Sequence, residues 1–287
     1  MSKSKKAERP AAPEPLSIPV VDNHTHLDIV VSGFDGGIEP DDARVIAELD
    51  AATAVGVHRV MQVGTDAASS HWAVGLAERD ARVLAAVALH PNDAPRLDDL
   101  DAGLAEIDAL AKHPRVAALG ETGMDFYRTE SDGRDKQERS FREHIAMAKS
   151  HGKALMIHDR DAHDDVLRVL DEAGAPDIVV MHCFSGDGEL ARECARRGYY
   201  MSFAGNLTFK NAANLREAAR ECPSQLLLVE TDAPFLAPVP FRGRHNGPFL
   251  LPATVRFLAD LLGRDLDALC TALSANTERA YGSWSGA

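Results

Sequence analysis

The stretch that indicates the fold of this chain lies near its start and reads Ile18-Pro19-Val20-Val21-Asp22-Asn23-His24-Thr25-His26-Leu27-Asp28. A short apolar run is followed at once by polar residues, as at the end of a buried strand. Residues two apart in an extended segment point the same way, so His24 and His26 present both imidazoles to one side. Two imidazoles flanked by carboxylates form half of a divalent-metal site. The alternative is a polar turn capped by Asp22 and Asp28.

The composition limits the class of protein. The chain has 287 residues, 45% of them hydrophobic and 26% charged, which is typical of a soluble globular protein. Its net charge of −13 provides no general basic field for holding nucleic acid, which argues against a stoichiometric nucleic-acid binder. An enzyme that handles phosphate through bound cations is compatible with this charge, because a metal inverts the charge of its own site.

The cysteines and the N-terminal residues indicate location and domain organisation. Four cysteines stand far apart without a Cys-x-x-Cys pair, which fits a reducing cytoplasm and no disulfide framework. Residues 1–17 have a basic start and an Ala/Pro/Glu stretch, and we predict a disordered tail there. Residues 18–287 are expected to form one domain. No apolar run is long enough to span a membrane, so we predict a cytoplasmic protein, and we expect a monomer.

Apolar runs alternate with segments of helical length along the rest of the chain. The pattern predicts strands at residues 19–22, 59–64, 83–89, 116–120, 154–157, 178–181, 199–203 and 226–230. It predicts helices at residues 41–56, 69–79, 97–112, 137–151, 162–173, 188–197, 211–220, 253–262 and 266–275. Eight strand–helix units with near-continuous apolar strands predict an α/β protein with a single-domain (β/α)8 TIM barrel. A doubly wound open sheet is the rival, but no Gly-rich phosphate loop follows the first strand.

Polar residues stand where most of these strands end. Barrel enzymes place their reactive groups at the carboxyl ends of the strands. The residues found there are His24, His26, His90, Glu121, His158, His182 and Asp232. One histidine after an apolar run is more often structural than a ligand. Imidazoles and carboxylates gathered at one end of a barrel indicate a metal site, because burying so many polar groups without one is costly.

Six motifs carry a resemblance that runs from about Ile18 to Tyr281. They are His24-x-His26-Leu27-Asp28, Gly120-Glu121-Thr122-Gly123, Ile157-His158-x-Arg160, His182-Cys183-Phe184-Ser185-Gly186, Glu230-Thr231-Asp232-Ala233-Pro234 and Arg242-Gly243-x-x-Asn246-x-Pro248. In this order and spacing they resemble the TatD-type metal-dependent deoxyribonucleases, a branch of the amidohydrolase-like barrels. Two positions depart from the pattern, His245 and Gly247, at the expected substrate mouth.

The resemblance implies two divalent cations. His24, His26 and Asp232 would hold one cation, His158 and His182 the other, and Glu121 would bridge them. Mg²⁺ or Mn²⁺ is expected, and the ligand mixture is also compatible with Zn²⁺. Asp232 and Glu121 are the expected catalytic residues, with Asp232 accepting the proton of the attacking water. Because the fourth strand ends in Glu121 and not in a lysine, the chain differs from the carbamoylated-lysine hydrolases of similar fold.

Other residues are candidates for binding the substrate. Arg128 and Arg160 would clamp phosphate, unless they pair with neighbouring Asp159, Asp161 or Glu130. His90 is predicted to contact phosphate or to support a ligand, with a structural role as the alternative. Arg242 and Asn246 are expected at the rim of the mouth. Three aromatic residues could either stack a base or anchor a loop: Phe126, Tyr127 and Phe184.

These residues predict a deoxyribonuclease of the 3′–5′ exonuclease type that acts on single-stranded ends. A second hypothesis keeps the dimetal hydrolase but changes the bond to an ester or amide, in a small molecule or a mischarged aminoacyl-tRNA. A third is an inactive binding protein with structural metals. A structural metal site has all its coordination positions filled by the protein. The ligands here come from five strands and leave coordination positions open, so the hypothesis of an inactive binding protein is disfavoured.

Overall fold

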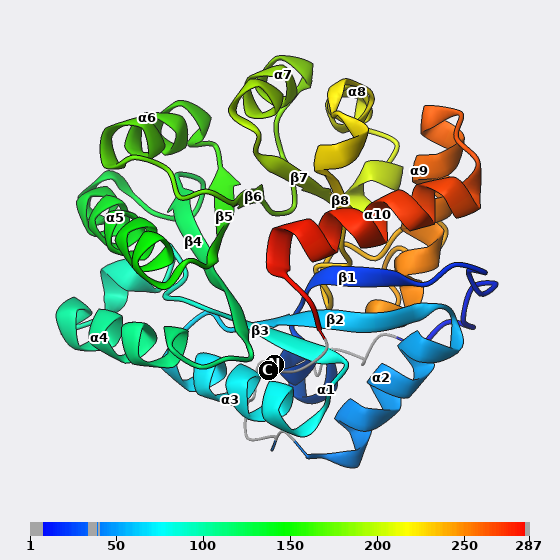
Figure 1. Ribbon diagram of the computed structural model, residues 1–287, viewed down its shortest axis with the longest axis horizontal. Coiled ribbons are helices and arrows are strands. Elements are labelled where there is room, and N and C mark those ends of the chain that lie inside the picture. Colours follow the sequence, from blue (N-terminus) through cyan, green and yellow to red (C-terminus); the bar gives the residue numbers. More distant parts are fainter. Residues whose placement is uncertain (1–7, 34–38, 40, 285–287) are drawn as a thin grey trace, which may run out of the picture.

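The computed structural model describes residues 8–33, 39 and 41–284. Eight parallel strands form one sheet in chain order, and the helices surround it (Figure 1). The strands are β1 Val20–Thr25, β2 Val57–Val63, β3 Val83–Val87, β4 Val116–Asp125, β5 Ala154–Arg160, β6 Val179–Met181, β7 Tyr200–Phe203 and β8 Leu227–Val229. The (β/α)8 barrel predicted from the alternation of strands and helices is therefore confirmed.

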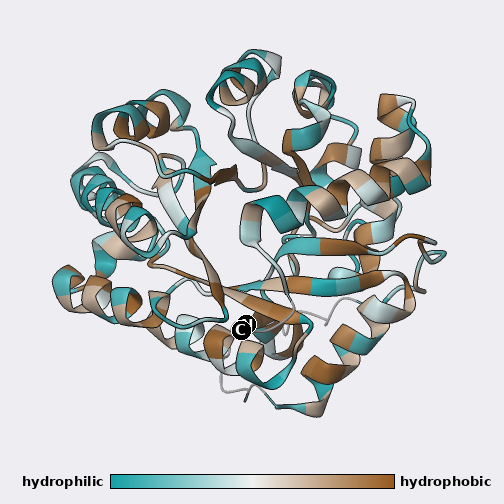
Figure 2. Cartoon of the chain, viewed as in Figure 1, coloured by the Kyte–Doolittle hydropathy of each residue, from teal (hydrophilic) through white to brown (hydrophobic). Residues whose placement is uncertain are grey.

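The helices follow the strands in the expected order. They are α1 Leu27–Ser32, α2 Ala43–Ala54, α3 Ala67–Arg79, α4 Leu100–Ala111, α5 Arg134–His151, α6 His163–Ala173, α7 Gly188–Arg197, α8 Ala213–Glu221, α9 Leu251–Leu262 and α10 Leu266–Tyr281. Asp42, Asp66, Asp99, Asp187 and Asp265 cap helices by accepting hydrogen bonds from backbone N–H groups. Figure 2 shows alternating hydrophobic and hydrophilic bands along outer helices such as α2 and α4, as expected for helices that cover a sheet.

The first and last strands meet through a few specific contacts. Thr25 forms an isolated parallel bridge with Ala233, and the Asp232 N–H donates to the His24 carbonyl at 3.0 Å. The Asn23 amide also donates to the Val229 carbonyl at 2.8 Å. These contacts bring residue 232, which follows β8, beside the histidines of β1.

Alternate side chains along each strand pack into two separate hydrophobic cores, one inside the barrel and one between the barrel and the helices. Met61, Val63, Leu84 and Ala86 fill the inside of the barrel, whereas Val60 and its neighbours outside pack against the helices. The end of the chain joins the inner core through Tyr281 and Trp284. This arrangement follows from the two-residue period of a strand buried on both faces.

Several boundaries differ from those predicted. The strands predicted at residues 19–22, 116–120 and 154–157 run on to Thr25, Asp125 and Arg160. The sequence pattern misses these extensions, because the apolar run by which a strand is recognised ends at the first polar site residue although the strand continues. Helix α1 lies before residue 41, where the sequence pattern predicts the first helix to start; residues 34–38 and 40 lie outside the described residues.

The predicted disordered tail differs from the described structure over residues 8–17. Leu16 is buried in the outer core, and its N–H donates to the Val55 carbonyl at 3.0 Å. Gly56 makes room for it, because a Cβ there would lie 2.8 Å from the Leu16 carbonyl oxygen. A proline-rich composition therefore concealed the anchoring of this segment at Leu16. Residues 1–7 lie outside the described residues.

Among the described residues, no helix has the length and apolar character needed to cross a membrane.

Candidate metal centre

The polar groups predicted from the strand ends converge at the carboxyl end of the barrel. His24 and His26 come from β1 and the turn after it, Glu121 from β4, and His158 from β5. His182 follows β6, and Asp232 follows β8. All but Asp232 and His158 are less than a tenth exposed, and three clusters among these residues, His90 and Glu230 have the spacing of metal ligands.

Glu121 lies at the middle of the cluster. Its Oε1 is 3.5 Å from the Nε2 atoms of both His24 and His26. Its Oε2 is 3.1 Å from Nδ1 of His158 and 2.9 Å from Nε2 of His182. One carboxylate thus faces two pairs of imidazoles through its two oxygens.

Contacts with groups outside the cluster fix the tautomers of His24 and His26. His26 Nδ1 donates to the Val63 carbonyl at 3.0 Å, and His24 Nδ1 faces the Met156 sulfur at 3.1 Å. We assign the proton to Nδ1 in both rings, which leaves the Nε2 lone pairs directed at Glu121. The two Nε2 atoms are 3.2 Å apart.

The other two histidines are each backed by a carboxylate. His182 Nδ1 lies 3.1 Å from Glu230 Oε1, and His158 Nε2 lies 3.2 Å from Asp125 Oδ2. Such outer carboxylates fix the tautomer of a metal-binding imidazole and raise its basicity. The sequence reasoning gave no role to Glu230 or Asp125. Asp125 could have been found from the strand period, since it lies four residues after Glu121 on the same strand.

Asp232 completes the half of the cluster near β1. Its Oδ1 is 3.8 Å from Nε2 of His24 and of His26. Burial raises the pKa of Asp232 to about 7, against the opposing charges of His182 and His26. The backbone just before it is fixed by buried Asp22, which accepts hydrogen bonds from the N–H and hydroxyl of Thr231. The sequence reasoning saw Asp22 only as a possible turn cap.

The donor set fits a pair of divalent cations. His24 and His26 direct imidazole lone pairs inward, and Glu121 and Asp232 add carboxylate oxygens, so these groups all accept. Burial lowers the pKa of His182, but Glu121 and Glu230 outweigh it and leave that pKa well above its ordinary value. A cluster that attracts positive charge in this way suits a cation bound by nitrogen and oxygen ligands.

A cavity of about 670 Å³ opens onto these groups. Three arginines line it, Arg96, Arg128 and Arg160, and the phosphate contacts expected of Arg128 and Arg160 stay a prediction. The Arg160 guanidinium lies over the ring of Tyr127 at 3.9 Å. Tyr127 is 64% exposed, so the stacked pair stands at the mouth.

His90 also lines this cavity. Its Nε2 is 3.6 Å from Glu121 Oε2, and its ring meets that of His158 at 4.6 Å. Burial lowers the pKa of His90 to about 3, so the ring is neutral. Its Nδ1 accepts from the Asn92 N–H at 3.0 Å, which leaves the Nε2 proton free to donate into the cavity.

Two residues predicted at the rim of the mouth lie elsewhere in the structure. Asn246 does not line the cavity: it is 1% exposed, and its amide donates to the backbone carbonyls of Thr231 and Phe235. Arg242 is exposed but lies over the Phe209 ring at 4.1 Å, outside the cavity lining. The partners of Asn246 and Arg242 lie elsewhere in the sequence, which is why the motif alone misplaced these two side chains. Of the two roles left open for Phe184, its 2% exposure and its packing near Phe203 exclude stacking of a base and fit an anchor.

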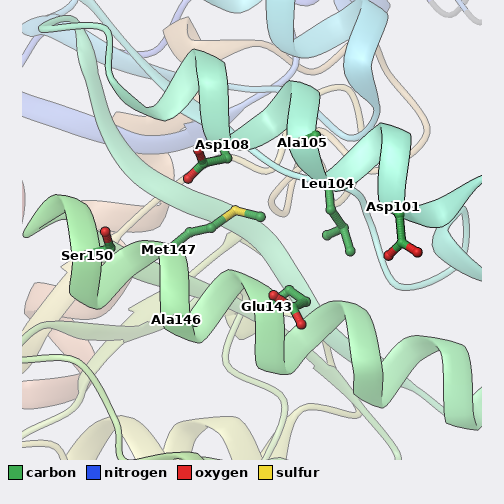
Figure 3. Close-up of a pocket in the computed structure, with 8 residues that line it drawn as sticks. All are labelled: Asp101, Leu104, Ala105, Asp108, Glu143, Ala146, Met147 and Ser150. Carbon is green, nitrogen blue, oxygen red and sulfur yellow. The ribbon is translucent and has the colours of Figure 1, made fainter.

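A second hollow lies between α4 and α5, away from the cluster. Figure 3 shows its carboxylates, Asp101, Asp108 and Glu143. Asp101 pairs with Arg139, and Asp108 pairs with Lys112 and His151. The hollow is a surface groove with largely compensated charges.

The fold and the cluster define the class of protein as a metal-dependent hydrolase on a TIM barrel. The family model "TatD related DNase" matches residues 21–282, and the chain belongs to this family. It is 46% identical over 267 residues to the "Uncharacterized metal-dependent hydrolase TatD" of Mycobacterium tuberculosis, covering 92% of this chain and 98% of that protein. The "Uncharacterized metal-dependent hydrolase YcfH" of Escherichia coli K12 is 37% identical over 91% of this chain and 95% of that protein.

A solved structure supports the same family. The crystal structure of YJJV, a TatD homolog from Escherichia coli, has a TM-score of 0.82 and 26% identity, covering 92% of this chain and 98% of that chain.

Proposed function

We propose that this protein is a deoxyribonuclease of the 3′–5′ exonuclease type that hydrolyses phosphodiester bonds at single-stranded DNA ends with two divalent cations, Mg²⁺ or Mn²⁺ before Zn²⁺. The position of Glu121 carries the proposal. Because one oxygen faces His24 and His26 and the other faces His158 and His182, the carboxylate is suited to bridge two cations. The same residues were expected from the sequence.

The chain's own groups have distinct roles in this proposal. When bound, two divalent cations would polarise the phosphodiester and make a water easier to deprotonate. Asp232 accepts the proton of that water, since its carboxylate lines the cavity beside His24 and His26. His90 donates from Nε2 to a phosphate oxygen, and Arg128 and Arg160 hold further oxygens at the mouth.

Two observations support DNA as the substrate. The family description names a DNase, and three arginines line the cavity, one of which, Arg160, lies over exposed Tyr127. Guanidinium groups match phosphate, and an exposed aromatic ring can stack an unpaired base. The acidic whole-chain charge of −13 instead favours the second candidate, an ester or amide hydrolase with a small substrate or a mischarged aminoacyl-tRNA.

A substrate panel under identical metal conditions separates the candidates. Metal-stripped protein reconstituted with Mn²⁺ is given single-stranded DNA, duplex DNA, RNA, an aryl ester, an N-acyl amide and an aminoacyl-tRNA. We expect single-stranded DNA to be degraded fastest, with His182→Ala inactive and still folded. Hydrolysis of the ester, the amide or the aminoacyl-tRNA but not of DNA would overturn the nuclease proposal and keep the hydrolase.

A further inference from the structure

Residues 8–17 form a segment that lies before the family match, which begins at residue 21. We call this segment the N-terminal strap; it leads into β1 (Figure 1). Its C-terminal part is fastened to the barrel by Leu16, by Ser17, which hydrogen-bonds Asp267, and by Arg256, which donates to the Glu14 and Pro15 carbonyls. Its N-terminal part contacts a different region, the residues that follow β8.

The contacts of Arg9 centre on a buried carboxylate of α2. Glu48 is 7% exposed, and its Oε1 pairs with Arg9 and lies 3.3 Å from Nε2 of His245. Burial raises the pKa of Glu48, but hydrogen bonds from His245 and Arg9 bring it below its ordinary value. The Arg9 guanidinium also lies over the Phe249 ring at 4.1 Å. Arg9 thus joins α2 to residues 245 and 249 at once.

Glu8 adds two further contacts to the same region. Its carbonyl accepts from the His245 N–H at 3.1 Å, and its carboxylate pairs with Arg244. The strap therefore contacts residues 244–249 through a backbone hydrogen bond, one ion pair and a cation–π contact, and the Arg9–Glu48 pair joins the strap to α2.

The fixed residues are linked directly to the cavity wall. Asn246, next to His245, donates its buried amide to the carbonyls of Thr231 and Phe235. Phe235 and Leu236 line the cavity, and Thr231 precedes Asp232. A short path of contacts thus runs from Arg9 through His245 and Asn246 to one wall of the substrate cavity.

We infer that the strap positions the segment of residues 235–249, which we call the mouth loop, and that Arg9 acts as a positioning residue for the wall of the substrate cavity. Loss of Arg9 removes the ion pair to Glu48 and the contact with Phe249, loosens the mouth loop and weakens substrate binding, while the cluster around Glu121 keeps its geometry. The part of the inference that concerns substrate rests on the proposed function.

Trypsin provides a readout that does not depend on activity. The mouth loop carries two cleavage sites, after Arg242 and after Arg244, and both residues are exposed. Full-length wild type, Arg9→Ala and Arg9→Lys are digested with limiting trypsin, and cleavage at these sites is followed by mass spectrometry. Ser17→Ala is the matched control, because Ser17 belongs to the strap but contacts Asp267 and not the mouth loop.

We expect Arg9→Ala to speed cleavage in the mouth loop roughly five- to thirtyfold, with Arg9→Lys between it and wild type and Ser17→Ala unchanged. With single-stranded DNA, Arg9→Ala should raise KM by a similar factor and leave kcat and the Mn²⁺ affinity unchanged. Unchanged cleavage rates in Arg9→Ala would overturn the inference, and so would an equal acceleration in Ser17→Ala. If wild type cleaves no DNA, the proposed function fails, while the proteolysis result still decides the positioning of the loop.

Discussion

Glu230 is expected to control how tightly the barrel binds a divalent cation without itself being the inner ligand. Its Oε1 accepts from the Cys183 N–H at 2.8 Å and faces Nδ1 of His182 at 3.1 Å. The opposite nitrogen of His182 points to Glu121. Glu230 therefore lies behind the imidazole, where its charge holds the ring and makes Nε2 a better ligand.

The change Glu230→Gln tests this placement. Glutamine keeps an oxygen that can accept both hydrogen bonds but removes the charge. Loss of such an outer carboxylate costs about 10- to 100-fold in metal affinity, equivalent to about 1.4–2.8 kcal/mol. The geometry around Glu121 should remain, so weaker binding and not loss of the site is the expected result.

Calorimetric titration of metal-stripped protein with Mn²⁺ measures the effect. The matched control is Glu143→Gln, an exposed carboxylate on α5 that lies in the hollow between α4 and α5. Circular dichroism establishes that all proteins are folded. An affinity within twofold of wild type in folded Glu230→Gln would refute the reasoning, because the His182–Glu230 contact would then not support a metal ligand.

Three further predictions concern stability and substrate binding. Burial lowers the pKa of His144 to about 4, so the unfolded state binds more protons between pH 6.5 and pH 4, and the free energy of unfolding falls by about 3 kcal/mol as pH drops through this window. Urea unfolding at pH 7 and pH 4 should show a smaller loss in His144→Gln, and equal losses would contradict the assignment. Tyr127→Ala should raise KM for single-stranded DNA by a factor that corresponds to about 1–3 kcal/mol of stacking, and an unchanged KM in a steady-state assay would argue against a stacked base. Mn²⁺ at about 100 times its Kd should raise the free energy of unfolding by about 2.7 kcal/mol in wild type but not in His24→Ala/His26→Ala, and equal stabilisation of both in urea titrations would place the cation elsewhere.

The fold and the inner cluster were predictable because they depend on local pattern. Apolar runs repeat with the period of a βα unit, and parallel strands bring all their carboxyl ends to one face. His24, Glu121, His158 and His182 could therefore be gathered from sequence positions alone. The same reasoning set strand ends too early, since Glu121 and His158 are polar residues within continuing strands.

The residues that sequence reasoning missed or misplaced depend on partners far along the chain. Glu230 backs His182 from 48 positions away, and Asn246 turns inward to hold Thr231 and Phe235 instead of facing substrate. Arg9 meets Glu48 and Phe249 only after the barrel has formed. No periodicity encodes such contacts, because each is a single long-range pairing of polar groups.

The proposed two-metal nuclease is tested most directly by the degradation of end-labelled single-stranded DNA by metal-stripped protein titrated with Mg²⁺, Mn²⁺ and Zn²⁺, with Asp232→Asn alongside. We predict a ladder that shortens from the 3′ end, requires added metal and disappears in Asp232→Asn, which stays folded. Undiminished cleavage by Asp232→Asn, or no cleavage with any of the three metals, would contradict it.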